Sequence, residues 1–303
     1  MLEQLTFAFG ITGPVLVLLI VGWGARKSGL ISEHFIGEAN RLVFNVAMPV
    51  MLYLAMTGRP LSETVDLRLS LVGLVGTLLL VGILFVVRHL VPDDERGVFI
   101  QGSYRGNLAI VGLALAVATY GNEALSLAAM YIAVVTTAYN IIAVLVLNAR
   151  GALRNILLNP ILLGILAGIM ASLLGVKLPT VMVRSGEYLS AMTLPTALLC
   201  IGASISFRSM TTHLMSLSLA VVFKLILSPL LLVSLGIAAG LTGESLGILF
   251  LMSASPTASA SYIMARQLTR HGALAAEIIV VTTTFGVLSY TLGLAFLRAQ
   301  GLI

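Results

Sequence analysis

The sequence has few charged residues and a single cysteine. Only 10% of its 303 residues are charged, against roughly 25% in an ordinary soluble domain. Hydrophobic residues make up 59% and the mean hydropathy is +1.08, so a water-soluble fold would have too little polar surface. Cys200 lies inside an apolar run, which excludes an intrachain disulfide and predicts a small buried side chain.

Other features that the sequence lacks narrow the class of protein further. No His or Cys cluster has metal-ligand spacing, and neither a metal nor another cofactor is expected. No hydrophilic stretch is long enough to form a second domain, so one domain is expected over residues 1–303. The residues before the first apolar run lack the basic region of a cleaved signal, and we expect that run to be a permanent helix.

The excess of basic residues has a membrane explanation. The net charge is +5, but the basic residues form short clusters between apolar runs, with no interleaved aromatic residues. This distribution argues against nucleic acid as a partner. It fits a membrane protein whose cytoplasmic loops are basic.

Ten apolar segments are candidates for membrane-spanning helices. A spanning helix needs about 20 mainly apolar residues, and the connections between the segments are short. The chain is therefore predicted to be an all-α integral membrane protein embedded in a lipid bilayer. The predicted spans are 6–25, 39–57, 68–90, 97–119, 123–147, 157–176, 185–206, 214–240, 244–265 and 273–297.

The distribution of Lys and Arg predicts the orientation. Basic residues favour the cytoplasmic side, and with the N-terminus outside they are twice as frequent on that side. The predicted cytoplasmic residues are Arg26, Lys27, Arg41, Arg88, Arg96, Arg150, Arg154, Arg208, Arg266 and Arg270. The predicted external residues are Arg59, Arg68, Lys177, Arg184 and Arg298. Both termini are therefore predicted to lie outside.

The two halves of the chain, 1–150 and 151–303, resemble each other weakly. Prolines and polar interruptions recur in the same order, and five spans per half require the second half to enter the membrane from the opposite side. This pattern predicts an inverted repeat, which is common in secondary transporters. The recurring prolines are Pro14 with Pro160 and Pro49 with Pro195.

The fourth and ninth predicted spans carry polar interruptions near mid-depth. Gly106 weakens the fourth span and Asn107 suits a helix restart. In the ninth, Ser255 reads as a helix cap and Pro256 as the first helical position, with Thr257 in the same interruption. Freed backbone groups are tolerated in lipid only inside protein or beside water. The paired breaks therefore predict one central cavity.

These breaks predict an anion site, with a packing explanation as the alternative. A half-helix N-terminus carries about +0.5 charge and free N–H groups, which suit a carboxylate. We assign Arg105, Gly106, Asn107, Asn140 and the 255–257 segment to the candidate substrate site. The alternative is a pair of kinks whose serines bond to the preceding turn.

Three polar residues inside spans have competing interpretations. Arg105 lies about 12 Å deep at about 1.5 Å per residue; it either provides positive charge beside the anion, extends to the cytoplasmic face or pairs with a structural acid. Lys224 is either a structural cation in place of a coupling ion, a group that loses its proton, or a residue that extends to the interface. Asn140, next to Tyr139, makes either an interhelical hydrogen bond or a ligand contact.

The four histidines are predicted to lie near helix ends at the cytoplasmic face. That position is typical of interfacial residues and not of proton relays. They are His34, His89, His213 and His271.

The sequence resembles the auxin efflux carrier family along nearly its whole length. The matching stretches are 40–49 (NRLVFNVAMP), 105–112 (RGNLAIVG), 194–202 (LPTALLCIG) and 254–258 (ASPTA). The resemblance implies two inverted five-helix repeats with broken, crossing fourth and ninth helices. It also implies a scaffold of the first, second, sixth and seventh helices that carries homodimer contacts, and six others that move past it like an elevator.

The resemblance also implies residue roles and a substrate class. Asn107 matches the family's fourth-helix asparagine, Pro256 its ninth-helix proline, and Asn140 an asparagine near the substrate. Bacterial relatives are described as permeases for malate, malonate or similar carboxylates, which implies the bacterial inner membrane. The plant carriers have proline where this chain has Gly106 and Asn107, which argues against auxin as the substrate.

Three functional hypotheses follow. The first is a secondary transporter that moves a small organic anion, such as a carboxylate, by alternating access. The second is a sodium- or proton-coupled cation antiporter of similar fold, against which the acidic residues count because they lie near segment ends. The third, an intramembrane enzyme, would need a buried Ser/His pair, paired aspartates or a metal motif, and none is evident. The chain is therefore predicted not to be an enzyme.

Overall fold

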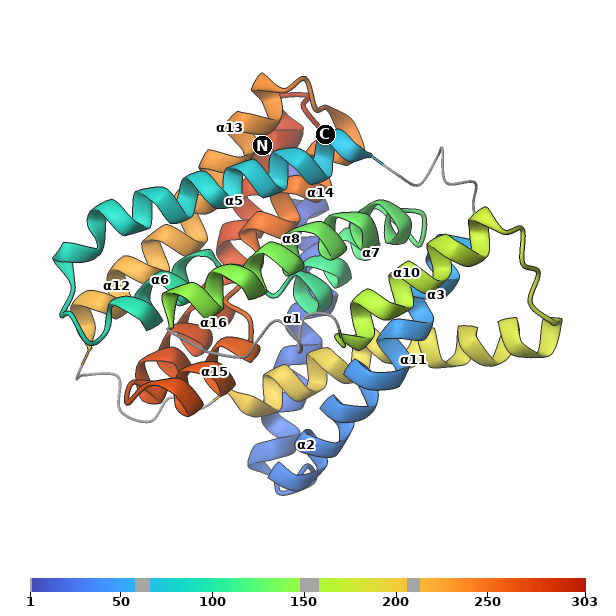
Figure 1. Ribbon diagram of the computed structural model, residues 1–303, viewed down its shortest axis with the longest axis horizontal. Coiled ribbons are helices and arrows are strands. Elements are labelled where there is room, and N and C mark those ends of the chain that lie inside the picture. Colours follow the sequence, from blue (N-terminus) through green and yellow to red (C-terminus); the bar gives the residue numbers. More distant parts are fainter. Residues whose placement is uncertain (1, 58–65, 148–157, 206–212) are drawn as a thin grey trace.

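The computed structural model describes residues 2–57, 66–147, 158–205 and 213–303, and these residues are almost entirely helical (Figure 1). The only pairing of extended residues among them is one isolated bridge. The helices of the first half are α1 (Leu2–Lys27), α2 (Glu33–Leu42), α3 (Met48–Thr57), α5 (Leu67–Val87), α6 (Arg96–Tyr104), α7 (Leu113–Tyr120) and α8 (Ala124–Val146). Those of the second half are α10 (Pro160–Leu173), α11 (Thr180–Ser204), α12 (Leu214–Val222), α13 (Ser228–Ala238), α14 (Gly243–Ala254), α15 (Ala260–Leu268) and α16 (Gly272–Ala299).

Short irregular helices join several of these elements. Three are π-helical, namely η1 (Val43–Ala47), η3 (Leu108–Gly112) and η4 (Phe223–Leu227), and one is a 3-10 turn, η2 (Arg88–Leu90). Two of the π turns come directly before a proline-containing helix, with Pro49 in α3 and Pro229 in α13. A proline removes one helical hydrogen bond and crowds the preceding turn, and a wider π turn accommodates this disruption.

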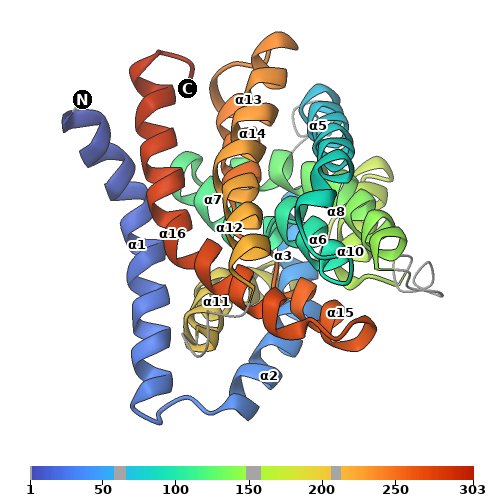
Figure 2. The ribbon, with the colours of Figure 1, turned by 90° about the vertical axis from the view of Figure 1, so that its left-hand side faces the viewer.

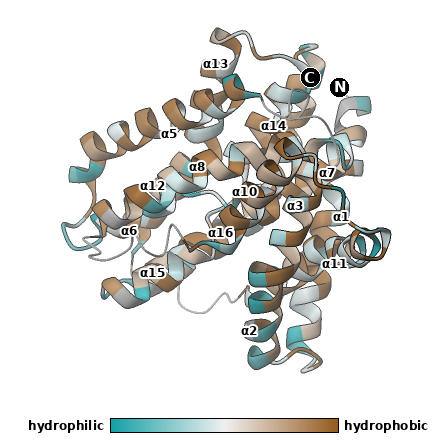
Figure 3. Ribbon diagram, turned by 45° about the vertical axis from the view of Figure 1, so that its right-hand side comes forward, coloured by the Kyte–Doolittle hydropathy of each residue, from teal (hydrophilic) through white to brown (hydrophobic). Residues whose placement is uncertain are grey.

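Six helical stretches of the described residues are long and apolar enough to cross a membrane. Many of their large apolar side chains are exposed, and Figure 3 shows hydrophobic residues in brown along most of the helices. Val86 of α5 and Phe296 of α16 are 72% and 61% exposed. An exterior of this kind suits lipid and not water. The six stretches are Thr6–Lys27, Glu33–Thr57, Leu67–Leu90, Ala124–Ala143, Leu214–Ala238 and Gly272–Ala299.

Polar caps fix where helices begin. The Asp66 carboxylate accepts a hydrogen bond from the Leu69 N–H at 2.9 Å. The Asn159 side chain accepts one from the Ile161 N–H at 3.0 Å, directly before Pro160. Each cap satisfies one of the N–H groups that a helix start leaves without an intrahelical partner.

Four of the basic residues that predict the orientation lie outside the described residues, namely Arg59, Arg150, Arg154 and Arg208.

The helices form two packing groups. We call α1, α2, α3, α10 and α11 the four-span group, and α5 to α8 with α12 to α16 the six-span group, after the numbers of predicted spans that they contain. Within the first, α1 packs on α11 and α3 on α10; within the second, α5 packs on α8 and α13, and α12 on α6 and α16. The groups meet where α1 packs on α16 and α3 on α8, and Figure 2 shows α1 beside α16.

Glycines allow very close helix contacts in the four-span group. A Cβ on Gly22 of α1 would collide with the carbonyl oxygen of Leu199 in α11, and a Cβ on Gly202 of α11 would collide with that of Leu19 in α1. In the same way, Gly164 and Gly168 of α10 face backbone atoms of α3. Small residues promote helix association in lipid because they allow the backbones to approach closely.

This packing makes Gly22 intolerant of a side chain. We expect Gly22→Ala to lower the melting temperature of the detergent-purified protein by several degrees, since overpacking costs about 1–3 kcal/mol. Gly24→Ala in the same helix is the matched control, because a Cβ there meets no atom within 4 Å. Equal melting temperatures of the two variants would show that the α1–α11 contact is looser than described.

Candidate functional site

The fourth and ninth predicted spans are both interrupted, and their interruptions cross. The first consists of α6, the extended residues 105–107, then η3 and α7; the second consists of α14, the extended residues 255–258, a turn at Ser259, then α15. Both extended segments are buried almost throughout. We call the place where they meet the crossing. The break predicted at Gly106 and Asn107 is thus confirmed.

Backbone hydrogen bonds join the two extended segments. Gly106 and Thr257 form an antiparallel bridge, in which the Asn107 N–H donates to the Pro256 carbonyl at 2.7 Å and the Ala258 N–H to the Arg105 carbonyl at 2.9 Å. Each broken helix therefore satisfies backbone groups that the other exposes. In lipid, an unsatisfied group of this kind costs several kcal/mol.

Side-chain hydroxyls complete the pairing at Thr257. Its hydroxyl donates to the Gly102 carbonyl in α6 at 2.7 Å. Its N–H donates to the Thr282 hydroxyl of α16 at 3.1 Å. The sequence did not single out Thr282; its only signal is that it is one of three consecutive threonines in an apolar helix.

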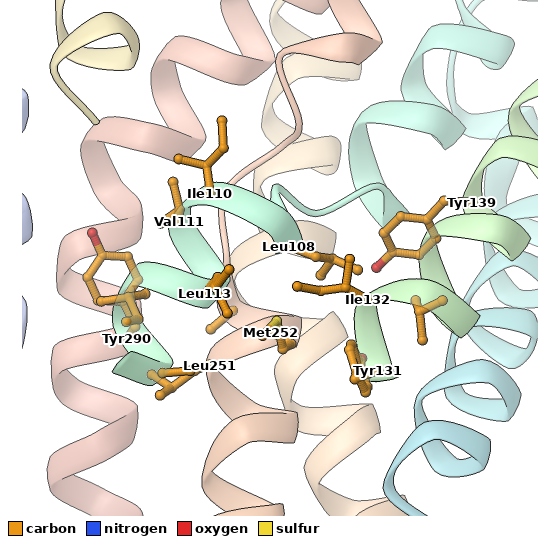
Figure 4. Close-up of a cluster of buried hydrophobic side chains, with 14 of the residues drawn as sticks. Leu108, Ile110, Val111, Leu113, Tyr131, Ile132, Tyr139, Leu251, Met252 and Tyr290 are labelled. Carbon is orange, nitrogen blue, oxygen red and sulfur yellow. The ribbon is translucent and has the colours of Figure 1, made fainter. Parts of the chain in front are cut away.

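The crossing leaves little room for a side chain at Gly106. A Cβ there would lie 2.7 Å from Ser255 Oγ and 3.1 Å from Lys224 Nζ. Directly after it, the first turn of η3 packs into the core. Figure 4 shows Leu108 near Met252 of the other broken helix and near Ile132 of α8, all of them buried.

Arg105 is held inside the protein by α8. It is 6% exposed, and its guanidinium donates to the Tyr139 carbonyl at 3.2 Å and to Asn140 Oδ1 at 2.6 Å. Both acceptors are neutral oxygens, and within the described residues no carboxylate lies within ion-pair distance of Arg105. This geometry contradicts the alternatives in which Arg105 extends to the cytoplasmic face or pairs with a structural acid.

Asn140 therefore lies at the crossing. Its side chain accepts the hydrogen bond from Arg105 of the broken helix, which agrees with the prediction of an interhelical hydrogen bond. The adjacent aromatic residues pack with it. Tyr104 donates from its hydroxyl to the Tyr139 carbonyl at 3.1 Å, and the two rings are 5.3 Å apart in an edge-to-face arrangement. Tyr139 thus provides a carbonyl to two residues of the broken helix.

Lys224 also lies at the crossing and not at an interface. It is fully buried in η4, and its ammonium donates to the Ser253 carbonyl at 2.9 Å. Ser253 is in the last turn of α14, where unpaired carbonyls carry partial negative charge. The alternative in which Lys224 extends to the interface is wrong, because the π turn directs its side chain at the end of a half-helix.

Two details of the predicted helix restarts are wrong. Ser255 does not cap a helix: its hydroxyl donates to the Met252 carbonyl at 2.7 Å, and α15 begins only at Ala260. The reason is that the backbone after Pro256 pairs with the other broken helix and stays extended. Asn107 precedes the restart as predicted, but its side chain makes no capping hydrogen bond.

A small cavity lies between the two packing groups beside the crossing. It holds about 30 Å³, enough for one water molecule and too little for a dicarboxylate. Its lining includes the end of α11 and Ser259, which directly follows the extended segment. The lining residues are Ile201, Ser204, Ile205, Ser259, Ile279, Val280 and Thr283.

The predicted site residues therefore share one place in the fold. The crossing brings together Arg105, Gly106, Asn107, Asn140, Lys224, Ser255, Pro256 and Thr257. Its charged side chains are basic, and the other members are neutral. The half-helix starts at Leu108 and Ala260 follow it directly. Such an arrangement offers positive charge and polar groups in a dry environment, where electrostatic interactions are strong.

Comparison with known proteins gives a family. A family model described as membrane transport protein matches the chain twice, over residues 11–156 and 144–293. Comparison with curated proteins gives no match. The two matches cover nearly the whole chain, one for each half, and agree with the apolar helices of a multi-pass membrane protein. The chain therefore belongs to the membrane transport protein family, the family of the auxin efflux carriers, as its motifs predicted.

Proposed function

We propose that this transporter moves a small organic anion, such as a carboxylate, across the plasma membrane as a secondary transporter. The observation that carries the proposal is the buried crossing of two broken helices with Arg105 and Lys224 beside it. Inside a membrane, buried ionisable residues indicate a substrate or ion pathway. Broken helices near mid-depth are the usual location of transporter substrate sites.

The charges at the crossing favour an anion over a cation. Arg105 is bonded to neutral oxygens, so its positive charge is available to a bound carboxylate. Its guanidinium has five N–H donors, which suit the two oxygens of a carboxylate. A cation antiporter of similar fold would need carboxylates here, and the described crossing has basic and neutral side chains instead.

The transporter would have ten spans in two inverted repeats. Six stretches are long and apolar enough to cross alone. The shorter apolar helix α10 would also cross, as would the broken pairs α6–α7 and α14–α15, in each of which one half is a shorter apolar helix. Helix α11 would complete the ten. The packing pairs support the symmetry, since α1 on α11 joins the first and seventh spans and α3 on α10 joins the second and sixth. In a repeat of five helices the first span corresponds to the sixth and the second to the seventh, so the repeat turns one of these pairs into the other.

Movement of the six-span group past the four-span group would give alternating access. The cavity between them has room for about one water molecule, so a carboxylate would enter only when the groups separate. The four-span group would be the fixed base, with a second copy of the chain bound through the first, second, sixth and seventh spans. Its glycine-mediated contacts bring the helices close together, which suits a fixed base.

The substrate test is uptake by proteoliposomes. Labelled malate and malonate should accumulate, and Arg105→Met should lower uptake at least tenfold, since a hydrogen bond to a charged group is worth about 1.5–3 kcal/mol. Arg41→Met is the matched control because Arg41 is exposed and 3.3 Å from Glu38. Melting temperatures verify folding. Absence of carboxylate uptake under proton gradients, sodium gradients and a membrane potential would refute the proposal; sodium-dependent proton release would instead indicate the antiporter.

Lys224 is expected to stabilise the end of α14. Lys224→Met should lower the free energy of unfolding by about 1.5–3 kcal/mol, because the Ser253 carbonyl loses a charged donor. Lys177→Met is the control, since Lys177 is exposed. Denaturation in mild detergent measures the difference. If both variants unfold alike while Lys224→Met alone abolishes proton-driven uptake, Lys224 is the proton-coupling group and not a structural cation.

The orientation is testable by cysteine labelling in cells. Cys200 is buried, and Cys200→Ala provides the background. Gln300→Cys near the C-terminus should react with a membrane-impermeant maleimide, whereas Ser28→Cys should react only after permeabilisation, because the termini are expected outside and the α1–α2 connection inside. The opposite labelling pattern would invert the orientation.

A further inference from the structure

We propose that the helix starts of α6, α12 and α16 form a binding site for a divalent transition-metal ion of the zinc type. The group consists of Glu95, His213 and His271, whose ligand atoms all lie within 4.8 Å of one another. Each residue directly precedes one of the three helices. The spacing in the sequence predicted no metal cluster, since these residues are far apart along the chain; the fold brings them together.

The donors are enclosed and already oriented. Glu95 Oε1 lies 2.6 Å from His213 Nδ1, and the side chains are 10% and 16% exposed. The other carboxylate oxygen of Glu95 accepts a hydrogen bond from the buried Ser216 hydroxyl. His271 Nε2 lies 3.0 Å from Asp94 Oδ2 and is 15% exposed. Metal-binding histidines and carboxylates are usually oriented by second partners, a role that Ser216 would have for Glu95 and that Asp94 would have for His271 with the ion on the other ring nitrogen.

Glu277 separately indicates that a cation binds at this cluster. It is 8% exposed, and its buried Oε2 has no hydrogen-bond partner among the described residues. Its charge interacts with both His213 and Glu95. A buried carboxylate oxygen without a partner is costly, and a cation at the cluster would remove that cost. Glu277 is therefore the fourth donor we assign.

The composition and geometry of the cluster match zinc. Two imidazoles and two carboxylates form a four-donor set of the type that Zn²⁺ takes, with bonds of about 2.0–2.2 Å. A tetrahedral ion would separate its donors by roughly 3.5 Å. The ligand atoms of Glu95, His213 and His271 lie within 4.8 Å of one another, and binding would exchange the Glu95–His213 hydrogen bond for metal bonds. Glu277 lies outside that spacing, so its side chain would have to move to take the fourth position. The two carboxylates balance the divalent charge and offset the positive helix starts.

A bound ion would tie α6 to α12 and α16 at one end of the six-span group. The last residue of α6 is followed directly by Arg105 and the crossing. The ion would thus fix the half-helix that carries Arg105 and stabilise the folded protein by binding it and not the unfolded chain. This site is separate from the proposed anion site and does not depend on the transported substrate.

The test uses the full chain with its purification tag removed, stripped with EDTA and exchanged into chelator-free buffer. Titration with zinc chloride should give one ion per chain and a higher melting temperature. His213→Ala, His271→Ala and Glu277→Gln should each weaken binding at least tenfold. His34→Ala and His89→Ala are the matched controls, since both histidines are exposed, and they should bind as the unmodified protein does.

Two measurements keep the test independent of folding defects. Melting temperatures in EDTA verify that the variants fold, and X-ray absorption at the zinc edge of the unmodified protein should report two imidazoles and two oxygen donors. Zinc affinity and stoichiometry that are unchanged in the His213→Ala/His271→Ala double variant would overturn the proposal. An absorption spectrum without imidazole ligands would also overturn it, as would a melting temperature that does not change with zinc. In either case the cluster would be only a hydrogen-bonded His–Glu pair.

Discussion

The backbone pairing between the two broken helices is the constraint on which the structure depends. Interrupting a helix inside a membrane frees N–H and C=O groups that lipid cannot satisfy. Here the interruption at Gly106 and the one after Ser255 satisfy each other through an antiparallel bridge. Neither break would be stable alone, so the two spans must meet. The absence of a side chain on Gly106 allows this approach.

The crossing also joins four half-helix ends, and one of its two basic residues, Lys224, compensates a negative end. Carbonyl ends carry partial negative charge and N–H ends partial positive charge. Lys224 donates to a carbonyl at the end of α14, whereas Arg105 turns from the end of α6 to oxygens of α8. The charge of Arg105 therefore remains available, which is why we propose an anion as the substrate.

The sequence was informative where hydropathy and helix breakers decide structure. The apolar segments correspond to the helices, and the polar interruption around Gly106 is the observed break. It was less informative at helix restarts: Ser255 and Pro256 have the local preferences of a cap and first turn, yet α15 begins at Ala260. Long-range pairing outweighed local preference, because extended backbone there has partners in the other broken helix.

The sequence by itself determined the membrane environment and the family, since both depend on composition and on local motifs, which are properties of the sequence alone. Only the tertiary structure decided which side chains meet. Arg105 was predicted beside a break, but its contact with Asn140 and the position of Lys224 depend on how α8 and η4 pack. The Glu95, His213 and His271 cluster was not predictable, because three connections far apart in the chain converge there.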